Sequence, residues 1–495
     1  MVTKCPRLVI AGLSGDAGKT ITSLSFLTAL RRRGLSLSVF KKGPDYIDAA
    51  WLAWAAQTEC RNLDTYMVTP DTVAASFAEA TTGSDLALIE GNRGLLDGRD
   101  ASGTHSTASL ARLLKAPVVL VVNCTKVTRT VAALVKGCQV LEPELKLAGV
   151  ILNRVAGNRH RRVITEAIEQ TCGLPVLGAI PKLDDGSTLI PGRHLGLVTP
   201  SEFGEDTGLQ ERLISIAEDY LDIDRMIEIA GDTESLAVTK RPKITPIKSR
   251  VRIGYFCDSV FTFYYPENLA ALQSRGAELV PVSSLEDESL PEIDSLYIGG
   301  GFPETQAEKL SHNLSMLQSV RKAAKSGLPI YAECGGLIFL CRSLTCNNQR
   351  YDLAGIFNFD LQMHSKPVGH GYTEIVVDRA NPYFEIGTVI RGHEFHYTGP
   401  SIEPVNTDGC MQVRTGVGLG NKRDGLIYKN CLACYTHLHV DGLPEWADAF
   451  VFQANDFQMR TSQPEADCQS QLEKTNIMEV FRRSGVETGV LASDC

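Results

Sequence analysis

A glycine-rich loop restricts the fold of this 495-residue chain more than any other feature of its sequence. The loop is GLSGDAGKT, residues 12–20, and it directly follows the apolar run RLVIA. Leucines then recur at helical spacing, at Leu24, Leu27 and Leu30. A strand, a glycine loop and a helix in this order bring backbone N–H groups together around a phosphate. The chain is therefore predicted to begin with an α/β domain that binds a nucleotide.

The loop is a longer variant of the strict pattern G-x-x-x-x-G-K-[ST], because Leu13 stands where the first glycine is expected. Gly15 and Gly18 allow N–H groups to converge on an anion. Lys19 is expected to reach the β- and γ-phosphates of ATP, and Thr20 is expected to ligate Mg²⁺ at the start of the helix. The alternative is a glycine-rich turn with a solvated lysine, and the order of strand, loop and helix disfavours it.

Short apolar runs alternate with helical patterns from residue 7 to about residue 230. Runs of this near-continuous kind are typical of strands that are covered on both faces. They read RLVIAG, LSLSVFKKG, LALIEG, APVVLVVN, LAGVILN and LPVLGAIP. The series predicts the α/β fold class, with a doubly wound, mostly parallel sheet in an ATP-binding domain over residues 1–230.

A second series of apolar runs predicts a second α/β domain over residues 251–455. The runs are VRIGYF, AELVPVS, SLYIGGG, LPIYAECGG and CLACYTHLHV. Residues 231–250 lose the apolar periodicity and gather prolines and basic residues, which indicates a linker. Residues 456–495 are polar and poorly patterned, so a disordered tail is predicted there in preference to a third domain.

Charged side chains collect in two loops at predicted strand ends of the first domain, where open α/β sheets bind their ligands. The loop FKKGPDYID contains Lys41, Lys42, Asp45 and Asp48, and the loop LIEGNRGLLDG contains Glu90 and Asp97. One such acid alone is usually a surface carboxylate or a helix cap. Four of them beside lysines and a phosphate loop favour a site for magnesium, nucleotide and substrate. Asn153, at the end of LAGVILN, is a weaker candidate for a contact with the nucleotide base.

A cysteine in the second domain stands where a nucleophile is expected. Cys334 follows an apolar strand and precedes two glycines and an apolar helix, which is an elbow that exposes a side chain above a sheet. This position is expected to lower the pKa of the thiol. His437 ends a later apolar run and is a candidate base, which weakens the alternative of a structural cysteine. Gly300 and Gly301, in YIGGGFPE, are candidate donors to an oxyanion.

Charge and composition exclude several classes of protein. A formal net charge of -9 argues against a general nucleic-acid binder, so a polyanionic ligand is expected to meet local cationic pockets. The longest apolar run, residues 116–122, is too short to cross a bilayer, and the N-terminus has no secretory pattern. We therefore expect a cytoplasmic protein with no membrane partner and with 14 reduced cysteines. Cys431 and Cys434 have metal-like spacing, but no second pair matches them.

Six motifs in a fixed order support a resemblance to a known family. They are KKGPDYID, EGNRGLLDG, YIGGGFPE, AECGG, GHEFHY and YTHLH. With them, residues 7–454 resemble the cobyrinate a,c-diamide synthase family, in which a dethiobiotin-synthetase-like ATPase domain precedes a class I-type glutamine amidotransferase domain. The resemblance implies a flavodoxin-like second domain. It also implies a ligase of corrin biosynthesis that amidates two acetate groups of cobyrinate through acyl phosphates, using ATP, Mg²⁺ and glutamine.

The resemblance further implies roles for residues of this chain. Cys334 would attack the carboxamide of glutamine, and His437 would raise the nucleophilicity of the thiol. Lys19 and Thr20 would serve ATP and Mg²⁺, with Glu90 as a second acid on the metal side. Gly15, Gly18, Lys41 and Asn153 are candidates for the nucleotide site from their own positions in the sequence. Asp45, Asp48 and Asp97 match acids expected near the metal, the acyl phosphate or the substrate carboxylate. Many amidotransferases of this class have a glutamate two residues after the histidine, whereas this chain has His439. The sequence thus supports a Cys/His pair and leaves a third member open.

Other functions stay open on the sequence alone. Nickel-sirohydrochlorin a,c-diamide synthase, of coenzyme F430 biosynthesis, has nearly the same motifs, and a hydrogenobyrinate substrate or a cobyric acid synthase are further rivals. A partitioning-type ATPase would need a catalytically silent second domain, which Cys334 and His437 disfavour. Arg391, His393 and His396, in RGHEFHYTG, either supply cations to a corrinoid polycarboxylate or form an aromatic cluster at a strand edge. A homodimer is neither predicted nor excluded.

Overall fold

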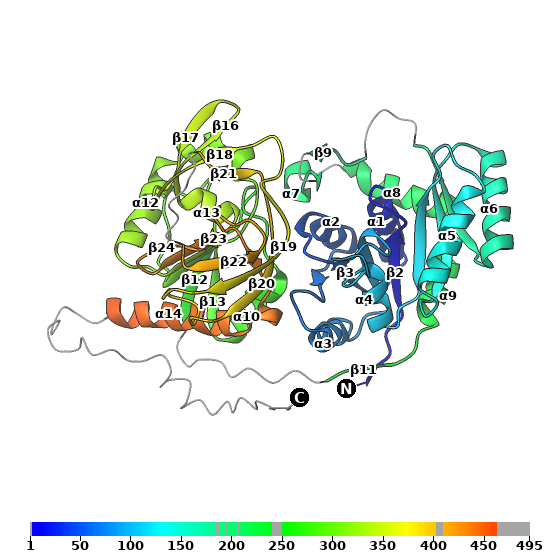
Figure 1. Ribbon diagram of the computed structural model, residues 1–495, viewed down its shortest axis with the longest axis horizontal. Helices are drawn as coiled ribbons and strands as arrows, with labels where there is room; N and C mark the ends of the chain where they lie inside the picture. Colours follow the sequence, from blue (N-terminus) through cyan, green and yellow to red (C-terminus); the bar gives the residue numbers. More distant parts are fainter. Residues whose placement is uncertain are drawn as a thin grey trace.

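The computed structural model describes residues 2–183, 189–193, 196–204, 207–239, 250–401 and 409–462. Figure 1 shows two domains side by side, each with a central sheet and helices on its faces. The first domain is coloured blue to green and the second green to orange, so the domains follow one another along the chain. In the part of the chain that the structure describes, no helix is both long and apolar enough to cross a membrane.

The first domain is built on a seven-stranded sheet in which every neighbouring pair of strands is parallel. The strand order is β4-β3-β5-β2-β6-β7-β8. These strands are β2 (Arg7–Gly12), β3 (Leu37–Lys42), β4 (Cys60–Leu63), β5 (Leu86–Gly94), β6 (Val118–Asn123), β7 (Leu147–Val155) and β8 (Val176–Pro181). The central strand β2 points Val9 into one apolar cluster and Leu8 and Ile10 into another. The predicted doubly wound parallel sheet is confirmed.

Helices cover both faces of this sheet. One face is covered by α1 (Lys19–Arg32), α2 (Tyr46–Ala56), α8 (Thr207–Tyr220) and α9 (Ile223–Gly231). The other is covered by α3 (Pro70–Ala80), α4 (Thr107–Leu113), α5 (Thr130–Leu141) and α6 (Asn158–Cys172). Shorter elements are β1 (Val2–Thr3), β9 (Gly192–Arg193), β10 (Gly196–Leu197), β11 (Leu236–Ala237) and α7 (Pro200–Phe203). Helix α1 begins at the lysine of the phosphate loop, as the sequence predicts.

The second domain has a six-stranded sheet in the order β13-β12-β14-β15-β25-β24. Its strands are β12 (Val251–Phe256), β13 (Ala277–Val282), β14 (Ser295–Ile298), β15 (Ile330–Glu333), β24 (Leu426–Tyr428) and β25 (Cys431–Cys434). All pairs are parallel except β24 with β25. The parallel strands thus have the order 2-1-3-4-5 along the chain, which is the flavodoxin-like order.

Further helices and two smaller sheets surround this second sheet. The helices are α10 (Pro266–Ser274), α11 (Ala307–His312), α12 (Leu314–Lys325), α13 (Gly335–Leu340) and α14 (Glu445–Ser462), with single turns η1 (Pro303–Thr305) and η2 (Val440–Gly442). One small sheet contains β23 (Arg423–Asp424), β22 (Met411–Thr415), β19 (Gly369–Val377), β20 (Val389–His396) and β26 (His437–Leu438). The other contains β17 (Gln349–Asp352), β16 (Cys341–Cys346), β18 (Phe357–Met363) and β21 (Thr398–Pro400).

The predicted end of the second domain, the linker and the tail can be compared with the structure only in part. Helix α14 continues to Ser462, across the boundary predicted after residue 455, and beyond that boundary Phe457 still packs against the apolar core. Half of the predicted linker, residues 240–249, and most of the predicted tail, residues 463–495, lie outside the described residues.

Aromatic side chains join the two domains. Tyr46, the first residue of α2, stacks on Phe263 of the second domain with 4.9 Å between ring centroids. The Tyr372 hydroxyl donates to Oδ2 of Asp64 at 2.6 Å, and the Tyr66 hydroxyl donates to the carbonyl of Thr373 at 3.1 Å. The loops after β3 and β4 therefore pack against the second domain, at the strand ends where the site residues were predicted.

Candidate functional site

Gly18 shapes the phosphate loop between β2 and α1. Its φ of 101° lies in the left-handed region, and a Cβ there would stand 2.0 Å from Nδ2 of Asn153. Asn153 donates from Nδ2 to the carbonyl of Ala17 at 2.9 Å. Lys19 donates from Nζ to the carbonyl of Arg93 at 2.8 Å. The amide of Asn153 therefore braces the loop, whereas the sequence suggested it for a contact with the base.

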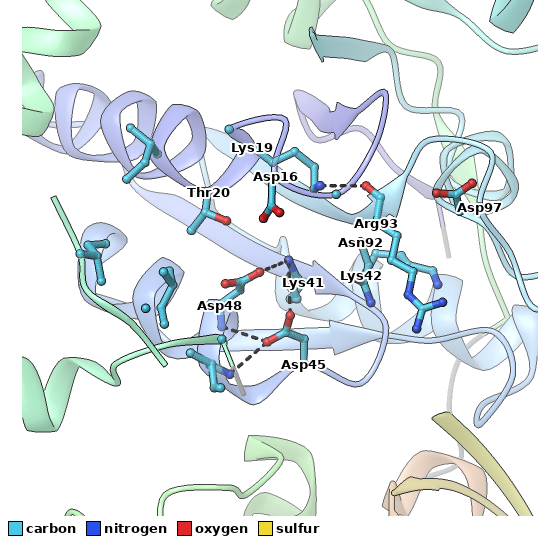
Figure 2. A pocket seen from close by; sticks show the side chains of 18 of the residues that line it. Asp16, Lys19, Thr20, Lys41, Lys42, Asp45, Asp48, Asn92, Arg93 and Asp97 are labelled. Atoms are coloured by element: carbon cyan, nitrogen blue, oxygen red, sulfur yellow. Dashed lines mark hydrogen bonds and ion pairs between the residues drawn. The ribbon is translucent and has the colours of Figure 1, made fainter. Parts of the chain in front are cut away.

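Next to the loop, one buried lysine gathers three carboxylates, two of which Figure 2 labels. Lys41 donates from Nζ to Oδ2 of Asp48 at 2.6 Å and to Oε1 of Glu90 at 2.7 Å. Oδ2 of Asp45 lies 3.7 Å from the same nitrogen. The Lys41 and Glu90 side chains are 1% and 0% exposed, so these charges meet almost without water. Removing one partner would leave a buried charge uncompensated.

The network divides its charge unequally between the acids. Burial and the neighbouring carboxylate of Asp48 raise the pKa of Asp45 to about 7. Burial acts in the same direction on Asp48, but the Lys41 ammonium outweighs it and holds the pKa of Asp48 below its usual value. Burial also opposes the charge of Lys41, but the carboxylates outweigh it and raise the pKa of Lys41. Asp45 is therefore the acid that can exchange a proton near neutral pH.

Oxygen atoms near Thr20 fit a magnesium ion that binds together with phosphates. The Thr20 hydroxyl donates weakly to Oε1 of Glu90, at 3.4 Å, and Oε2 of Glu90 is buried without a hydrogen-bond partner. Mg²⁺ prefers hard oxygen ligands and commonly takes one or two carboxylates with substrate phosphates and water. Among the described residues, no group of three or more His, Cys, Asp or Glu side chains could hold a metal ion. A magnesium site here would therefore use phosphate oxygens.

Asp45→Asn is expected to stabilise the nucleotide-free protein, and to do so more at pH 8 than at pH 5. In the folded protein the Asp45 carboxyl has a pKa of about 7. In the unfolded chain the pKa of an aspartate is about 3.9. Between these values the unfolded chain has lost the proton that the folded chain keeps, so wild-type stability falls as the pH rises to about 7. Asparagine carries no charge and can still cap α2. We expect the gain in unfolding free energy to be about 2–3 kcal/mol larger at pH 8, measured by urea unfolding.

Asp97→Asn is the matched control for this change, because Asp97 is an exposed acid that lines the same cavity. It is expected to leave the free energy of unfolding within about 0.5 kcal/mol of wild type, as surface substitutions commonly do. A gain for Asp45→Asn that is equal at pH 5 and pH 8 would contradict the raised pKa of Asp45.

Two cations, Lys42 and Arg93, face the same space, and neither makes an ion pair with an acid among the described residues. Lys42 is 6% exposed, and within the described ranges its ammonium makes neither a hydrogen bond nor an ion pair. Burial lowers its pKa, and the more distant Asp64 opposes that shift. Figure 2 shows Lys42 and Arg93 together on one side of Lys41, with Asp97 beyond them. Because a buried, unpaired ammonium is costly, an anionic ligand is expected to meet these two cations.

Cys334 occupies a strained turn between β15 and α13. Its φ of 46° and ψ of -97° lie outside the helix and strand regions. Its N–H donates to the carbonyl of Cys434 at 2.8 Å, and its Sγ lies 3.9 Å from the carbonyl of Phe395. The predicted elbow is present, but the predicted decrease in the thiol pKa is wrong. Burial, helped by the nearby Glu304 carboxylate, raises the pKa of Cys334 well above its usual value.

His437 follows β25, the parallel neighbour of the strand that precedes Cys334. Its Nδ1 lies 3.5 Å from Oε2 of Glu333. Its other edge faces Gly300, where a Cβ would stand 2.4 Å from Cε1 and 3.2 Å from Nε2. Within the described residues, no hydrogen bond joins His437 to Cys334. The structure thus brings the predicted base and nucleophile to one end of the sheet.

The two glycines predicted to bind an oxyanion have different surroundings. The Gly300 N–H donates to the carbonyl of Phe263 at 3.3 Å, so this donor is already used. The nitrogen of Gly301 lies 2.9 Å from the place that a Cβ on Gly335 would take, next to the nucleophile turn. Its N–H makes no hydrogen bond to any described residue. Gly301 is therefore the better placed donor, and Gly300 is not free to act as one.

The motif RGHEFHYTG does not place three free cations at the site. His393 is hydrogen-bonded to the hydroxyl of Tyr265 at 2.9 Å, and burial with the neighbouring His437 lowers its pKa well below the usual value. Its ring stacks on that of His437, with 4.8 Å between centroids. His396 is buried beside Glu394, with 3.5 Å between Nε2 and a carboxylate oxygen. The buried cluster that the sequence left as an alternative describes these two histidines better.

One cavity of about 1610 Å³ joins the two groups of residues. From the first domain it is lined by Gly15, Gly18, Lys19, Thr20, Lys41, Lys42, Asp45, Asp48, Arg93, Asp97 and Asn153, and from the second by His370, Tyr372, His393 and His437. Cys334 lies beyond this lining. Tyr46 stands between the two ends, with ring centroids 4.6 Å from Tyr265 and 5.4 Å from His437. Tyr46 had no role in the sequence prediction, although it lies inside the motif KKGPDYID.

Comparison with known proteins matches both domains. Residues 8–192 match the model of the CobQ/CobB/MinD/ParA nucleotide binding domain, and residues 252–444 match the CobB/CobQ-like glutamine amidotransferase domain.

Curated relatives are similar along nearly the whole chain, and those described here are each called cobyrinate a,c-diamide synthase. The relative from Magnetococcus marinus is 42% identical over 453 residues, which cover 90% of this chain and 97% of that protein. The one from Archaeoglobus fulgidus is 39% identical over 451 residues, with coverages of 91% and 97%. The one from Listeria innocua is 38% identical over 444 residues, with coverages of 88% and 96%.

Proposed function

The chain belongs to the cobyrinate a,c-diamide synthase family, and from that premise we propose that it converts the a- and c-acetate groups of cobyrinate into amides in cobalamin biosynthesis. Glutamine supplies the nitrogen, and ATP activates each carboxylate as an acyl phosphate. A carboxylate is a poor electrophile, so its activation precedes the attack of ammonia. The reaction runs in the cytoplasm, a location with which the free thiols of the twelve described cysteines agree.

Cys334 and His437 release ammonia from glutamine. His437 takes the thiol proton, the sulfur attacks the carboxamide carbon, and the proton passes to the departing ammonia. The N–H of Gly301 donates to the oxyanion that forms on the carboxamide oxygen. Water then hydrolyses the γ-glutamyl thioester, which releases glutamate and restores the thiol. Since burial keeps Cys334 protonated at rest, proton transfer to His437 is what creates the nucleophile.

Activation of the acetate takes place beside the phosphate loop. The loop binds the phosphates of ATP, and an acetate oxygen attacks the γ-phosphorus while ADP leaves. Lys19 neutralises charge on the transferred group. Thr20, Asp45 and Glu90 would hold Mg²⁺, which when bound supplies positive charge to the phosphates.

Ammonia then attacks the acyl carbon, phosphate leaves, and the new amide loses a proton. The departing phosphate can take that proton, because the carboxylate of Asp45 is assigned to Mg²⁺ in this arrangement. Asp48 keeps Lys41 charged and in place, and Asp97 lies where the reacting acetate would enter. Lys42 and Arg93 bind other carboxylates of the macrocycle, since neither cation makes an ion pair within the ranges that the structure describes. This arrangement supports a polycarboxylate as the substrate.

The observation that carries the proposal is the single cavity that reaches from Lys19 to His437. Ammonia in open water would be protonated to ammonium, which is not a nucleophile. A cavity shared by the two domains gives ammonia a short path to the acyl phosphate. An ATPase that only binds a partner protein would have no use for a buried imidazole at the far end of its nucleotide cavity, with a cysteine in a strained turn at the same end of the sheet.

The test is an assay of purified protein with ATP, Mg²⁺ and glutamine in which the macrocycle is followed by mass spectrometry. Cobyrinate, hydrogenobyrinate and nickel-sirohydrochlorin are offered in parallel. We expect two successive replacements of a hydroxyl by an amino group on cobyrinate, each with one ADP and one glutamate formed.

Preferred turnover of either other macrocycle would assign the chain a different substrate within the same reaction. ATP hydrolysis and glutamine hydrolysis without any amide product would overturn the proposal. Replacing more than two carboxylates would identify a multi-amidating enzyme of the cobyric acid synthase type.

A further inference from the structure

Two buried histidines near the nucleophile each face a different buried glutamate. His437 lies 3.5 Å from Glu333, measured from Nδ1 to Oε2. His439 lies 3.7 Å from Glu267, measured from Nε2 to Oε2. All four side chains are 5% exposed or less. Since position 439 holds a histidine where related amidotransferases carry a glutamate, one of these carboxylates can take over the missing function.

Glu333 is held in place by groups on both sides of it. It ends β15 and directly precedes Cys334, so its backbone is part of the nucleophile turn. Its Oε1 accepts from the N–H of Leu438 at 3.3 Å, and its Oε2 accepts from the hydroxyl of Tyr297 at 3.3 Å. These bonds leave Oε2 beside Nδ1 of His437, which has no hydrogen-bond partner in the described residues. The carboxylate is thus fixed and aimed at one nitrogen of the base.

This contact selects which nitrogen of His437 carries the proton. A carboxylate next to Nδ1 favours a proton on Nδ1, and the lone pair of the neutral ring then lies on Nε2. The Nε2 edge is the one that faces Gly300, and His437 lines the cavity. The ring is therefore oriented with its basic nitrogen toward the space in which glutamine is handled.

The second pair, His439 and Glu267, does not place a carboxylate beside His437. Nδ1 of His439 accepts from the N–H of Asp441 at 3.2 Å, so this nitrogen carries no proton. The other nitrogen points to Glu267, and the ring packs on Tyr265 with 4.6 Å between centroids. Glu267 thus pairs with a histidine that is not among the described residues lining the cavity. It serves as a control for the effect of a buried glutamate as such.

We propose that Glu333 is the positioning carboxylate of the glutamine-hydrolysing site, in place of the glutamate that is absent at position 439. The proposal rests on the glutaminase half of the proposed function. Glu333 touches neither glutamine nor the reacting atoms. It acts through His437, by fixing the tautomer and orientation of the ring and by stabilising the imidazolium that forms when the ring takes the thiol proton.

The experiment compares Glu333→Gln with Glu267→Gln in the full-length protein. Glutamate release from glutamine is measured alone, and amidation is measured separately with glutamine and with ammonium. In Glu333→Gln we expect kcat for glutamine hydrolysis to fall about 10²–10⁴-fold, as an amide in this position does in other histidine-based sites. KM for glutamine is expected to stay within about twofold, because Glu333 does not contact the substrate. Glu267→Gln is expected to keep kcat within about fivefold.

Several outcomes would overturn the proposal. One is a Glu333→Gln variant that hydrolyses glutamine at the wild-type rate, and another is an equal loss of kcat in Glu267→Gln. A rise in KM with kcat unchanged would assign Glu333 to substrate binding instead. Loss of amidation with ammonium would indicate structural damage, and Glu333→Asp, which keeps the charge on a shorter arm, is then the deciding variant. It should retain more glutaminase activity than Gln or Ala at this position.

The separate assays of glutamate release and of amidation also distinguish a failure of this proposal from a failure of the proposed ligase function. If no macrocycle is amidated with either nitrogen source, the proposed ligase activity fails. Glutamate release still tests Glu333 in that case, because it needs only Cys334, His437 and glutamine.

Discussion

Cys334→Ala is expected to abolish glutamine-driven amidation and to leave ammonium-driven amidation close to the wild-type rate. Alanine removes the sulfur that forms the thioester, and no other described cysteine shares its strained turn beside His437. In the proposed mechanism the acyl phosphate forms next to Lys19, which lines the cavity, and that step does not involve the thiol. The glutamine-driven rate should fall by at least about 10³-fold. The measurement is amide formation on the macrocycle with glutamine and, separately, with high ammonium.

Cys341→Ala is the matched control for this variant. Cys341 is also fully buried, lies at the other end of helix α13, and has its pKa raised by burial. Removing its sulfur should cost a little packing energy and leave both activities within about twofold. If Cys334→Ala lost amidation with both nitrogen sources while Cys341→Ala kept it, the two halves of the reaction would not be separable as proposed.

The cluster of acids and lysines in the first domain could be predicted from the sequence because parallel strands end at one edge of a sheet. Lys41 and Glu90 are far apart in the chain, yet β3 and β5 are neighbours, and their register places these two residues opposite each other. The strands themselves could be predicted because each is buried on both faces and therefore reads as an apolar run. Neither step required the strand order, which the sequence did not reveal.

Properties that depend on depth of burial could not be read from local motifs. The elbow at Cys334 was evident from the strand and the two glycines, and a thiol there was expected to ionise easily. The surrounding domain instead buries the sulfur, and the pKa rises. In the same way, a glycine-rich turn suggested free N–H groups, but Phe263, from a loop distant in sequence, accepts the one from Gly300.

The contact between Glu333 and His437 also depends on long-range packing. It forms because β26 places Leu438 and His437 against the end of β15. The one local signal was the position of Glu333 in the motif AECGG, directly before the nucleophile. In a strand that is otherwise apolar, a buried acid needs a partner, and that requirement could have drawn attention to Glu333.

Lys19→Met is expected to abolish amidation with either nitrogen source, by at least about 10³-fold, and to leave glutamine hydrolysis within about threefold of wild type. The side chain is 8% exposed, and its ammonium bonds only to the carbonyls of Ser14 and Arg93 in the described residues. Burial and the nearby Lys41 lower the pKa of Lys19, so its charge is disfavoured in the nucleotide-free protein. The variant should therefore fold at least as stably as wild type, which a thermal melt without nucleotide would show.

Two further lysines make this result diagnostic. Lys126→Met changes a lysine that lines the same cavity, and we expect it to keep amidation within about threefold. Lys41→Met should instead lower stability by about 3–5 kcal/mol, because the buried carboxylate of Glu90 loses its partner. If the Lys19→Met protein amidated at the wild-type rate, the lysine of the phosphate loop would have no role in acetate activation, which would contradict the prediction. If Lys19→Met instead lost as much stability as Lys41→Met, Lys19 would stabilise the fold. The proposal that its charge serves the phosphates of ATP would then be wrong.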